Sequence, residues 1–184
     1  MIIGVTGSIC SGTSTFMSFL NEKRFIGFSY SDILREELSK TGKEITRKNL
    51  QDIGDELRKK EGLGVLSRRM IEKMDNGKNY VVGNIRNPGE VEEFRKEFGD
   101  NFILIRLDAD FQVRFDRARK RARENEPMEL EAFKKMEERD LGENEEEHGQ
   151  QHKRVFEMAD FVIENNQGLG ELKDKVDELL ADLG

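Results

Sequence analysis

The apolar residues of this chain gather in short, dense runs that are separated by long polar stretches. Runs of this kind, apolar at nearly every position, are typical of strands that are buried on both faces of a sheet. They predict five strands, at residues 2–6, 25–28, 80–83, 102–107 and 161–163.

Helical patterns occupy the stretches between these strands. They predict helices at about residues 14–22, 88–97, 110–123 and 170–182, with two or three more between residues 31 and 76. Because strands that alternate with helices pair in parallel, the pattern predicts a single α/β layered domain. The acidic segment 137–147 is expected to be a solvated loop.

The charge balance argues against some functions. The 184 residues carry a net charge of −7, and a general nucleic-acid-binding protein would show a basic excess instead. The single cysteine, Cys10, rules out an internal disulfide and fits a reducing compartment. No apolar run approaches the ~20 residues of a membrane span. The N-terminus opens directly into a strand without a leader, so we expect a cytoplasmic protein.

A glycine-rich turn joins the first predicted strand to the first predicted helix. Residues 7–14 fit the pattern G-x-x-x-x-G-x-S, in which glycines let successive backbone N–H groups point into one concavity. The positive end of the following helix adds to this anion site, and the Ser14 hydroxyl is placed to contact Mg²⁺. We expect the donor phosphates at Gly7, Ser8, Ile9, Cys10, Ser11, Gly12, Thr13, Ser14 and Thr15.

One position departs from the usual phosphate loop. Thr13 stands where a lysine normally reaches the β- and γ-phosphates, so a positive charge is missing. The alternative interpretation is an ordinary Gly/Ser-rich turn, but a strand before it and a helix after it favour phosphate binding. Cys10 is expected to fill the loop rather than to act as a nucleophile.

Three residues outside the loop are candidates for the acceptor site. Arg86 follows the third strand, at the edge where parallel sheets bind ligands, and Arg35 is the second candidate for a phosphate contact. The alternative for Arg35 is a surface ion pair with an acid such as Glu36. Asp32 is expected either to orient an acceptor hydroxyl or a metal-bound water, or to cap a helix.

Five arginines follow the fourth strand. Helical spacing places Arg114, Arg117 and Arg121 on one stripe, and Arg119 and Arg123 on another. One stripe could cover the phosphates and supply the charge that Thr13 lacks. Because charge runs are usually solvated faces, we expect about two of the five to touch nucleotide.

The remaining candidates are weaker. A turn after the last strand offers backbone groups to a base, or is an ordinary turn, at Asn165, Asn166 and Gly168. Gln150 and Gln151 could also touch a base, and Asp108 and Asp110 are expected to initiate a helix. His148 and His152 could share a helix face, but no third ligand accompanies them, so no metal site is expected there.

Five segments together carry a resemblance to a known family. They are residues 4–15 (GVTGSICSGTST), 31–35 (SDILR), 84–87 (NIRN), the arginine-rich stretch 114–123 and residues 159–166 (ADFVIENN). In order and spacing they resemble the nucleoside monophosphate kinase-like branch of P-loop proteins, and more closely small deoxynucleotide and dephospho-coenzyme A kinases. The resemblance covers nearly the whole chain.

The resemblance implies an architecture. It implies a three-layer P-loop fold with a five-stranded parallel sheet in the order 2-3-1-4-5. The core would comprise residues 1–30, 77–113 and 155–184. A helical insertion that binds the nucleoside monophosphate would span 31–76, and a lid would span 114–154.

The resemblance also implies an activity: an ATP-dependent, Mg²⁺-assisted kinase for a nucleotide-like acceptor, most of all a (deoxy)nucleoside monophosphate. It implies catalytic roles for Asp32, Arg86, Arg117 and Arg121, acceptor contacts from Arg35, and a base contact from Asn166. The protein would be a monomer or a homodimer.

Two alternatives stay open. One is a dephospho-coenzyme A kinase-like activity with Asp32 as the base. The other is a degenerate, non-catalytic nucleotide-binding protein, because Gly83 replaces the acidic residue that often follows the third strand and Thr13 replaces lysine.

Overall fold

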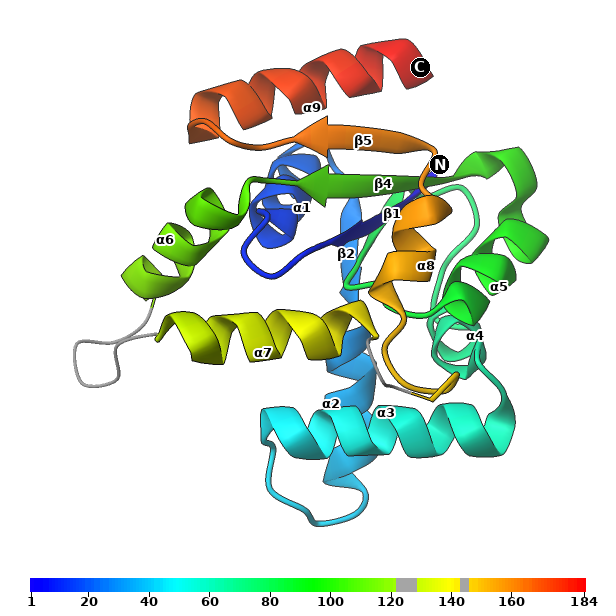
Figure 1. The fold of residues 1–184 in the computed structure, drawn as a ribbon. Coiled ribbons are helices and arrows are strands. Elements are labelled where there is room, and N and C mark those ends of the chain that lie inside the picture. Colours follow the sequence, from blue (N-terminus) through cyan, green and yellow to red (C-terminus); the bar gives the residue numbers. More distant parts are fainter. Residues whose placement is uncertain (122–128, 143–145) are drawn as a thin grey trace.

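The computed structural model of the chain describes residues 1–121, 129–142 and 146–184. Its centre is a parallel sheet with the strand order β2-β3-β1-β4-β5, as the family resemblance implied (Figure 1). The strands are β1 (Ile2–Gly7), β2 (Ile26–Ser29), β3 (Tyr80–Gly83), β4 (Phe102–Asp108) and β5 (Phe161–Glu164). All five predicted strands are confirmed to within one or two residues at each end.

Helices cover both faces of the sheet and extend beyond one of its edges. They are α1 (Thr13–Glu22), α2 (Tyr30–Ser39), α3 (Arg47–Glu61), α4 (Val65–Ile71), α5 (Pro88–Phe98), α6 (Phe111–Arg121), α7 (Leu130–Leu141), α8 (His152–Glu157) and α9 (Leu169–Leu183), with a short 3₁₀ turn, η1 (Gly99–Asn101). In the part of the chain that the structure describes, none of these helices is long and apolar enough to cross a membrane.

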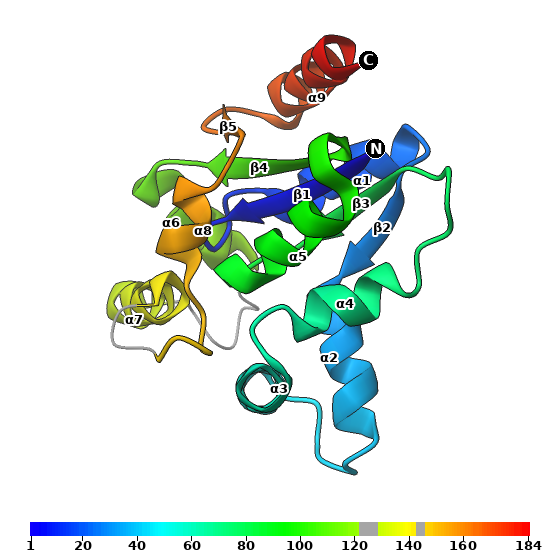
Figure 2. The ribbon, with the colours of Figure 1, turned by 90° about the vertical axis from the view of Figure 1, so that its right-hand side faces the viewer.

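Alternate strand residues supply two separate cores, one on each face. Ile3 and Val5 of β1 pack with α1 and α9, whereas Ile2 belongs to the core beneath α4, α5 and α8. Figure 2 shows α5 and α8 on the face of the sheet away from α9. This period of two along a strand produces the three-layer arrangement.

Helices α7 and α8 were not predicted from the sequence. α7 includes residues 137–141, so the expected solvated loop at 137–147 is wrong for that part, while residues 143–145 lie outside the described ranges. Phe133 explains the helix, because its fully buried ring packs against Phe111 and Phe115 of α6. Its acidic neighbours therefore lie on a helix that the apolar contact stabilises.

The register of the central strands brings two loops together. Val5 of β1 is paired with Gly83 of β3, so the residues that follow these strands emerge side by side. A hydrogen bond of 2.9 Å from the Thr6 hydroxyl to the Ile85 carbonyl joins the two strand ends. The phosphate loop after β1 and the Arg86 segment after β3 thus share one edge of the sheet.

Candidate functional site

The loop between β1 and α1 has the shape of an anion cradle. Cys10 and Gly12 adopt left-handed backbone angles, with φ of 63° and 108°, and the Ser11 amide donates to the Ser8 carbonyl at 3.0 Å. Gly12 directly precedes α1 and has no side chain with which to cap it. The first-turn amides of α1, which lack intrahelical acceptors, are thereby left to an anion.

Arg117 and Asn165 hold the loop through hydrogen bonds to its backbone carbonyl oxygens. The Arg117 guanidinium donates to the Cys10 carbonyl at 3.3 Å and to the Asn165 carbonyl at 2.8 Å. The Asn165 side-chain amide donates to the Ser11 carbonyl at 2.7 Å. These hydrogen bonds hold the Cys10 and Ser11 carbonyl oxygens on one side of the loop. In a trans peptide unit the N–H group points opposite to the carbonyl oxygen, so the N–H groups of these units point to the other side. Arg117 was predicted to have a catalytic role toward the transferring phosphate, and in the structure its guanidinium contacts the backbone of the loop.

The surroundings of Arg117 disfavour the charged form of its guanidinium. Partial burial lowers the pKa of its guanidinium, and repulsion from the nearby Arg121 lowers it further. The hydrogen bonds to loop carbonyls compensate for lost water contacts. Arg117 therefore stabilises one conformation of the loop.

The turn after β5 lies beside the phosphate loop, and the residue that contacts the loop is Asn165 rather than Asn166. A cavity of about 260 Å³ is lined by Gly12, Arg117, Asn165 and Gly168 among others. The Asn166 side chain instead accepts a hydrogen bond of 2.7 Å from the Asp110 amide, at the start of α6. Sequence reasoning missed the loop-holding role of Asn165, since its neighbour Asn166 fits the same turn pattern.

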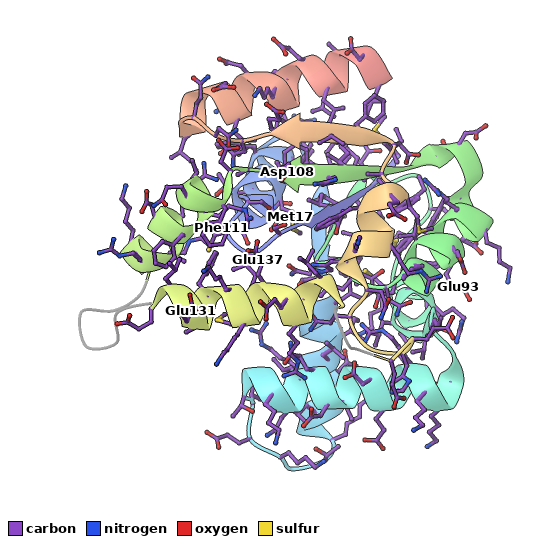
Figure 3. The ribbon with its side chains drawn as sticks, in the orientation of Figure 1. Met17, Glu93, Asp108, Phe111, Glu131 and Glu137 are labelled. Atoms are coloured by element: carbon purple, nitrogen blue, oxygen red, sulfur yellow. The ribbon has the colours of Figure 1, made fainter. Side chains whose placement is uncertain are left out.

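The residues that the structure describes supply few ligands for a magnesium ion. Ser14 is exposed at the second position of α1, directly after the phosphate loop. At Gly83, a Cβ atom would lie 2.2 Å from the sulfur of Met17, which fills the space that a carboxylate would need (Figure 3). Among the described residues, no group of three or more His, Cys, Asp or Glu side chains could hold a metal. A Mg²⁺ ion at this site would have the Ser14 hydroxyl as its protein ligand and would take its other oxygen ligands from phosphate and water.

A second, larger cleft opens between the helices of residues 31–76 and the segment after β3. Its volume is about 360 Å³, and Arg35, Arg58 and Arg86 all line it. Asp55 is the only acidic residue among the described residues of its lining. Guanidinium groups on the wall of a cleft favour an anionic ligand, because their planar forks match phosphate oxygens.

Arg86 is held in a defined orientation. Its Nη1 donates to Gln150 Oε1 at 3.2 Å and lies 3.8 Å from the buried carboxylate of Asp140 on α7. Its backbone amide donates to Glu90 Oε2 at 2.9 Å. Gln150 therefore contacts a predicted site arginine, which the sequence did not indicate.

Arg35 and Asp32 form a pair with one another at the rim. Arg35 Nη1 lies 3.1 Å from Asp32 Oδ1, and Glu36 is paired with Lys73 instead. The Asp32 side chain is 69% exposed and is absent from the described lining of the cleft. Ser29 caps α2 by accepting from the Ser31 amide, so the alternative in which Asp32 caps the helix is wrong.

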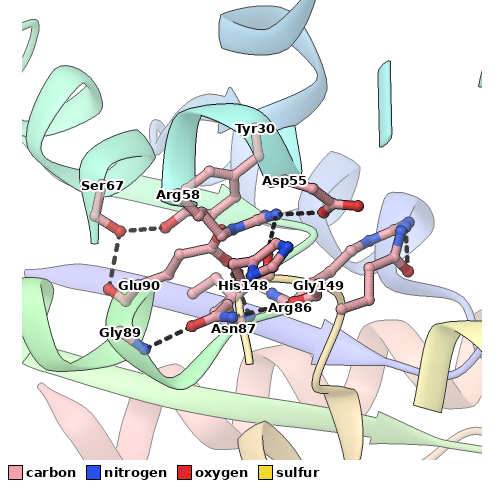
Figure 4. A network of polar contacts seen from close by, with 12 residues as sticks. Tyr30, Asp55, Arg58, Ser67, Arg86, Asn87, Gly89, Glu90, His148 and Gly149 are labelled. Carbon is pink, nitrogen blue, oxygen red and sulfur yellow. Dashed lines mark hydrogen bonds and ion pairs between the residues drawn. The ribbon is translucent and has the colours of Figure 1, made fainter. Parts of the chain in front are cut away.

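Beneath the cleft lies a buried ion pair that sequence analysis did not find. Arg58 of α3 donates to Glu90 Oε1 of α5 through Nε at 3.2 Å and Nη2 at 2.7 Å (Figure 4). The other oxygen of Glu90 accepts from the Arg86 and Asn87 amides. Glu90 is fully buried and Arg58 is 5% exposed. The capping-box pattern Asn87 to Glu90 was visible in the sequence, but Arg58 lies 32 residues away.

The same network reaches α2 and α4. The Tyr30 hydroxyl lies 2.7 Å from the Ser67 hydroxyl, which donates to the Glu90 carbonyl at 2.9 Å. Burial, with a further contribution from the Glu90 charge, holds the pKa of Tyr30 well above its usual value. Tyr30 is therefore a neutral hydrogen-bonding side chain at the floor of the cleft.

The arginines of α6 do not act as one stripe. Arg114 is buried and pairs with Glu137 of α7, which lies opposite Phe111 in Figure 3. Arg121 Nη1 lies 3.9 Å from the sulfur of Cys10, whereas Arg119 lies over the Phe115 ring. Arg123 lies outside the described residues. Arg117 and Arg121 are thus the two of the described arginines that contact the phosphate loop.

The other predicted residues have local partners. Asp108 is the last residue of β4 and accepts from the Ala109 amide at 2.9 Å, so its expected role in starting a helix is wrong. The Asp110 carbonyl accepts from the Arg114 amide and lies at the start of α6, as expected. Gln151 donates its backbone amide to the Arg86 carbonyl at 2.7 Å. His148 precedes α8 rather than sharing that helix with His152.

Comparisons with known proteins agree with this architecture. Residues 3–148 match the AAA domain family. The chain is 33% identical over 182 residues to a UPF0200 protein of Methanosarcina mazei, covering 98% of this chain and 94% of that protein. It is 34% identical to a UPF0200/UPF0201 protein of Archaeoglobus fulgidus, of which it spans 55%.

Solved structures support the fold at low sequence identity. Shikimate kinase from Aquifex aeolicus superposes with a TM-score of 0.57 at 18% identity, covering 100% of this chain and 96% of that one. Dephospho-CoA kinase from Campylobacter jejuni superposes with a TM-score of 0.51, also at 18% identity, covering 100% and 97%. The chain therefore belongs to the AAA domain family, it is a relative of the UPF0200 proteins, and it has a P-loop kinase-like fold.

Proposed function

We propose that this protein is an ATP-dependent phosphotransferase whose acceptor is a (deoxy)nucleoside monophosphate. The observation that carries the proposal is the shared edge of β1 and β3. One strand leads into an anion cradle and its neighbour leads to Arg86, in a cleft lined by guanidinium groups. Two anionic groups held at neighbouring strand ends can be brought together for transfer.

In this proposal each part of the chain has a separate task. The loop amides hold the donor phosphates, and Arg35 and Arg86 hold the acceptor phosphate. An acceptor phosphate oxygen attacks the γ-phosphorus, the bond from that phosphorus to the β–γ bridging oxygen breaks, and ADP leaves. Mg²⁺ near Ser14 would neutralise phosphate charge when bound. Arg121, beside Cys10, supplies a positive charge near the loop that Thr13 does not.

The acceptor class follows from the position of Asp32. A phosphate oxygen is already anionic and needs no general base, whereas a hydroxyl acceptor needs one within hydrogen-bond reach. Asp32 is exposed, is paired with Arg35 and is absent from the described lining of the cleft. This favours a monophosphate acceptor over the dephospho-coenzyme A alternative, which a direct assay with dephospho-coenzyme A would test.

A coupled assay for ADP formation across the common (d)NMPs tests the proposal. We expect turnover with at least one of them, and release of the matching diphosphate. Cys10 provides an independent measure of donor binding, because the chain has one cysteine and it lies in the loop. ATP should slow its reaction with a thiol reagent. Protection of Cys10 without turnover of any monophosphate would contradict the kinase proposal while supporting nucleotide binding.

A second candidate function is nucleotide binding without phosphoryl transfer. The observation in its favour is Met17, whose sulfur occupies the position of a side chain at residue 83. Together with Thr13, this removes two groups that commonly handle the γ-phosphate and the metal. The Thr13→Lys variant separates the two candidates. A large gain in rate would indicate a degenerate site, and an unchanged or lower rate would indicate a site adapted to threonine.

A further inference from the structure

Gln150 is a buried polar residue in the wall of the larger cleft. It is 7% exposed and lies on the segment of residues 146–151 that leads into α8. It lines the cleft together with Arg86, so the small part of its surface that protein does not cover faces the cleft. A buried side-chain amide of this kind needs hydrogen-bond partners for both its oxygen and its nitrogen.

The orientation of the Gln150 amide follows from the chemistry of its neighbour. Arg86 Nη1 lies 3.2 Å from Gln150 Oε1, and a guanidinium group can only donate hydrogen bonds. The oxygen of the amide therefore faces Arg86, and the NH₂ group points elsewhere. Among the described residues no acceptor is found for Nε2, and this atom is not one of the polar atoms sealed from solvent without a partner. Its N–H groups are thus directed to the cleft.

The backbone on both sides of Gln150 is fixed. Asn87 Nδ2 donates to the Gly149 carbonyl at 3.1 Å, and Figure 4 shows these two residues side by side. The Gln151 amide donates to the Arg86 carbonyl at 2.7 Å. Because Gln150 lies between these two contacts, its amide is already ordered, and a ligand that binds it has little side-chain freedom to remove.

The position of the amide indicates which part of a ligand it would meet. Gln150 and Arg86 lie at the end of the cleft where β3 ends, and β3 is paired with β1, which leads into the phosphate loop. For transfer, the reacting oxygens of the acceptor must lie at this end, next to the donor phosphate. The hydrogen bond from Arg86 also polarises the amide, which makes its N–H groups better donors to a charged oxygen.

We propose that Gln150 binds the acceptor phosphate directly, by donating from Nε2 to one of its oxygens beside Arg86. The inference rests on the proposed function and deepens it, since it adds a neutral donor to the acceptor site. It also names a phosphate oxygen, rather than the base, as the partner of Gln150. Every monophosphate has such an oxygen, so the contribution of Gln150 should be the same whatever the base.

Two substitutions test the donor. Gln150→Met keeps a similar volume without an N–H group, and Gln150→Glu keeps an oxygen for Arg86 but replaces the donor with a carboxylate that repels phosphate. In calorimetric titrations with CMP, AMP, GMP and UMP, Gln150→Met should weaken each measurable affinity by about tenfold to 100-fold, and Gln150→Glu by about 100-fold or more. Gln112→Met, at an exposed position of α6 outside the cleft lining, is the matched control and should bind like wild type.

A nuclear magnetic resonance measurement distinguishes a direct contact from an effect through Arg86. The side-chain NH₂ signals of Gln150 are identified by their loss in the spectrum of Gln150→Met. They should shift downfield when a monophosphate is added, because their protons then bond to a charged oxygen. Unshifted signals in a protein that binds the nucleotide would show that Gln150 only orients Arg86, and would overturn the inference.

Folding of each variant is followed by circular dichroism. If Gln150→Met does not fold, Gln150→Glu decides, because its oxygen can still accept from Arg86. Unchanged affinity in the folded variants, or a loss confined to one base, would overturn the inference and, with normal wild-type turnover, leave the proposed kinase activity standing. The expected losses of affinity without ADP formation would contradict only the kinase activity. No binding of any monophosphate by the wild type would overturn both.

Discussion

At the scale of single residues, the main feature is the buried pair of Arg58 and Glu90. It joins α3 to α5 and orients the Arg86 backbone through the second oxygen of Glu90. Both charges are removed from water, so each depends on the other for its stability in the interior. The pair therefore links the stability of the fold to the geometry of the cleft.

Removing one partner of this pair should destabilise the protein strongly. Arg58→Met leaves the Glu90 carboxylate buried without its guanidinium and should lower the free energy of unfolding by about 3–5 kcal/mol. The measurement is urea unfolding followed by circular dichroism. The control is Arg68→Met, whose partner Glu93 lies 2.6 Å away in a half-exposed pair, with an expected cost of about 0–1 kcal/mol. Similar losses in the two variants would show that burial of the pair has no special role.

Arg86 should matter to the acceptor and little to the donor. If the proposed function holds, Arg86→Ala should lower kcat/KM for the acceptor by about 100-fold, since one charge-assisted contact contributes about 1.5–3 kcal/mol. Protection of Cys10 by ATP should be unchanged. The control is Arg95→Ala, which removes the exposed ion pair between Arg95 and Asp160. Equal losses in donor and acceptor parameters would argue against an acceptor role.

At the scale of elements, the arginine-rich helix α6 and the unpredicted helix α7 form one unit. The rings of Phe111, Phe115 and Phe133 pack together, and the Arg114–Glu137 ion pair adds to this contact. α7 also places Asp140 near Arg86, while α6 places Arg117 against the phosphate loop. A change in this helix pair can therefore reach both parts of the site.

Phe133→Ala should separate the two helices. The ring is fully buried, so its removal should cost about 3–5 kcal/mol if the pair unfolds with the whole domain. Hydrogen exchange should show faster exchange in α6 and α7 than in the sheet. Leu130→Ala, at a position 40% exposed on the same helix, should change stability by about 0.5 kcal/mol or less. Uniformly faster exchange across the chain would contradict a separable helix pair.

Residues of α6 and α7 also show why the strands could be predicted from the sequence and helix α7 could not. The periodicity of apolar residues predicted the strands correctly because each strand is a continuous buried run. α7 has a mostly charged sequence, and its helix depends on the burial of Phe133 against rings about 20 residues earlier. Such a contact leaves no local pattern, so an acidic helix was interpreted as a loop.

At the scale of the whole molecule, the sheet order places the phosphate loop and the Arg86 segment at adjacent strand ends. β1 lies between β3 and β4, so the loop after it adjoins the Arg86 segment on one side and the start of α6 on the other. Ligands that bind at this edge should stabilise the entire domain, because they contact segments from distant parts of the chain.

ATP with Mg²⁺ should therefore raise the melting temperature. A ligand at 100 times its Kd adds about 2.7 kcal/mol to the free energy of unfolding, which for a domain of this size corresponds to roughly 5–11 °C. The measurement is thermal unfolding across a range of ATP concentrations. Arg117→Ala should reduce this shift in melting temperature, since the loop loses the hydrogen bonds of the Arg117 guanidinium. A melting temperature independent of ATP would contradict donor binding at the loop.

Local sequence patterns were sufficient to predict the strands, most of the helices and the phosphate loop. Each depends on residues that are close together in the chain: buried runs, helical spacing, and glycines between a strand and a helix. These local patterns could not predict contacts between residues that are far apart in the sequence. The contacts of Arg58 with Glu90, of Asn165 with Ser11 and of Met17 with Gly83 arise when the sheet assembles, because burial and hydrogen-bond geometry select those partners among many of similar type.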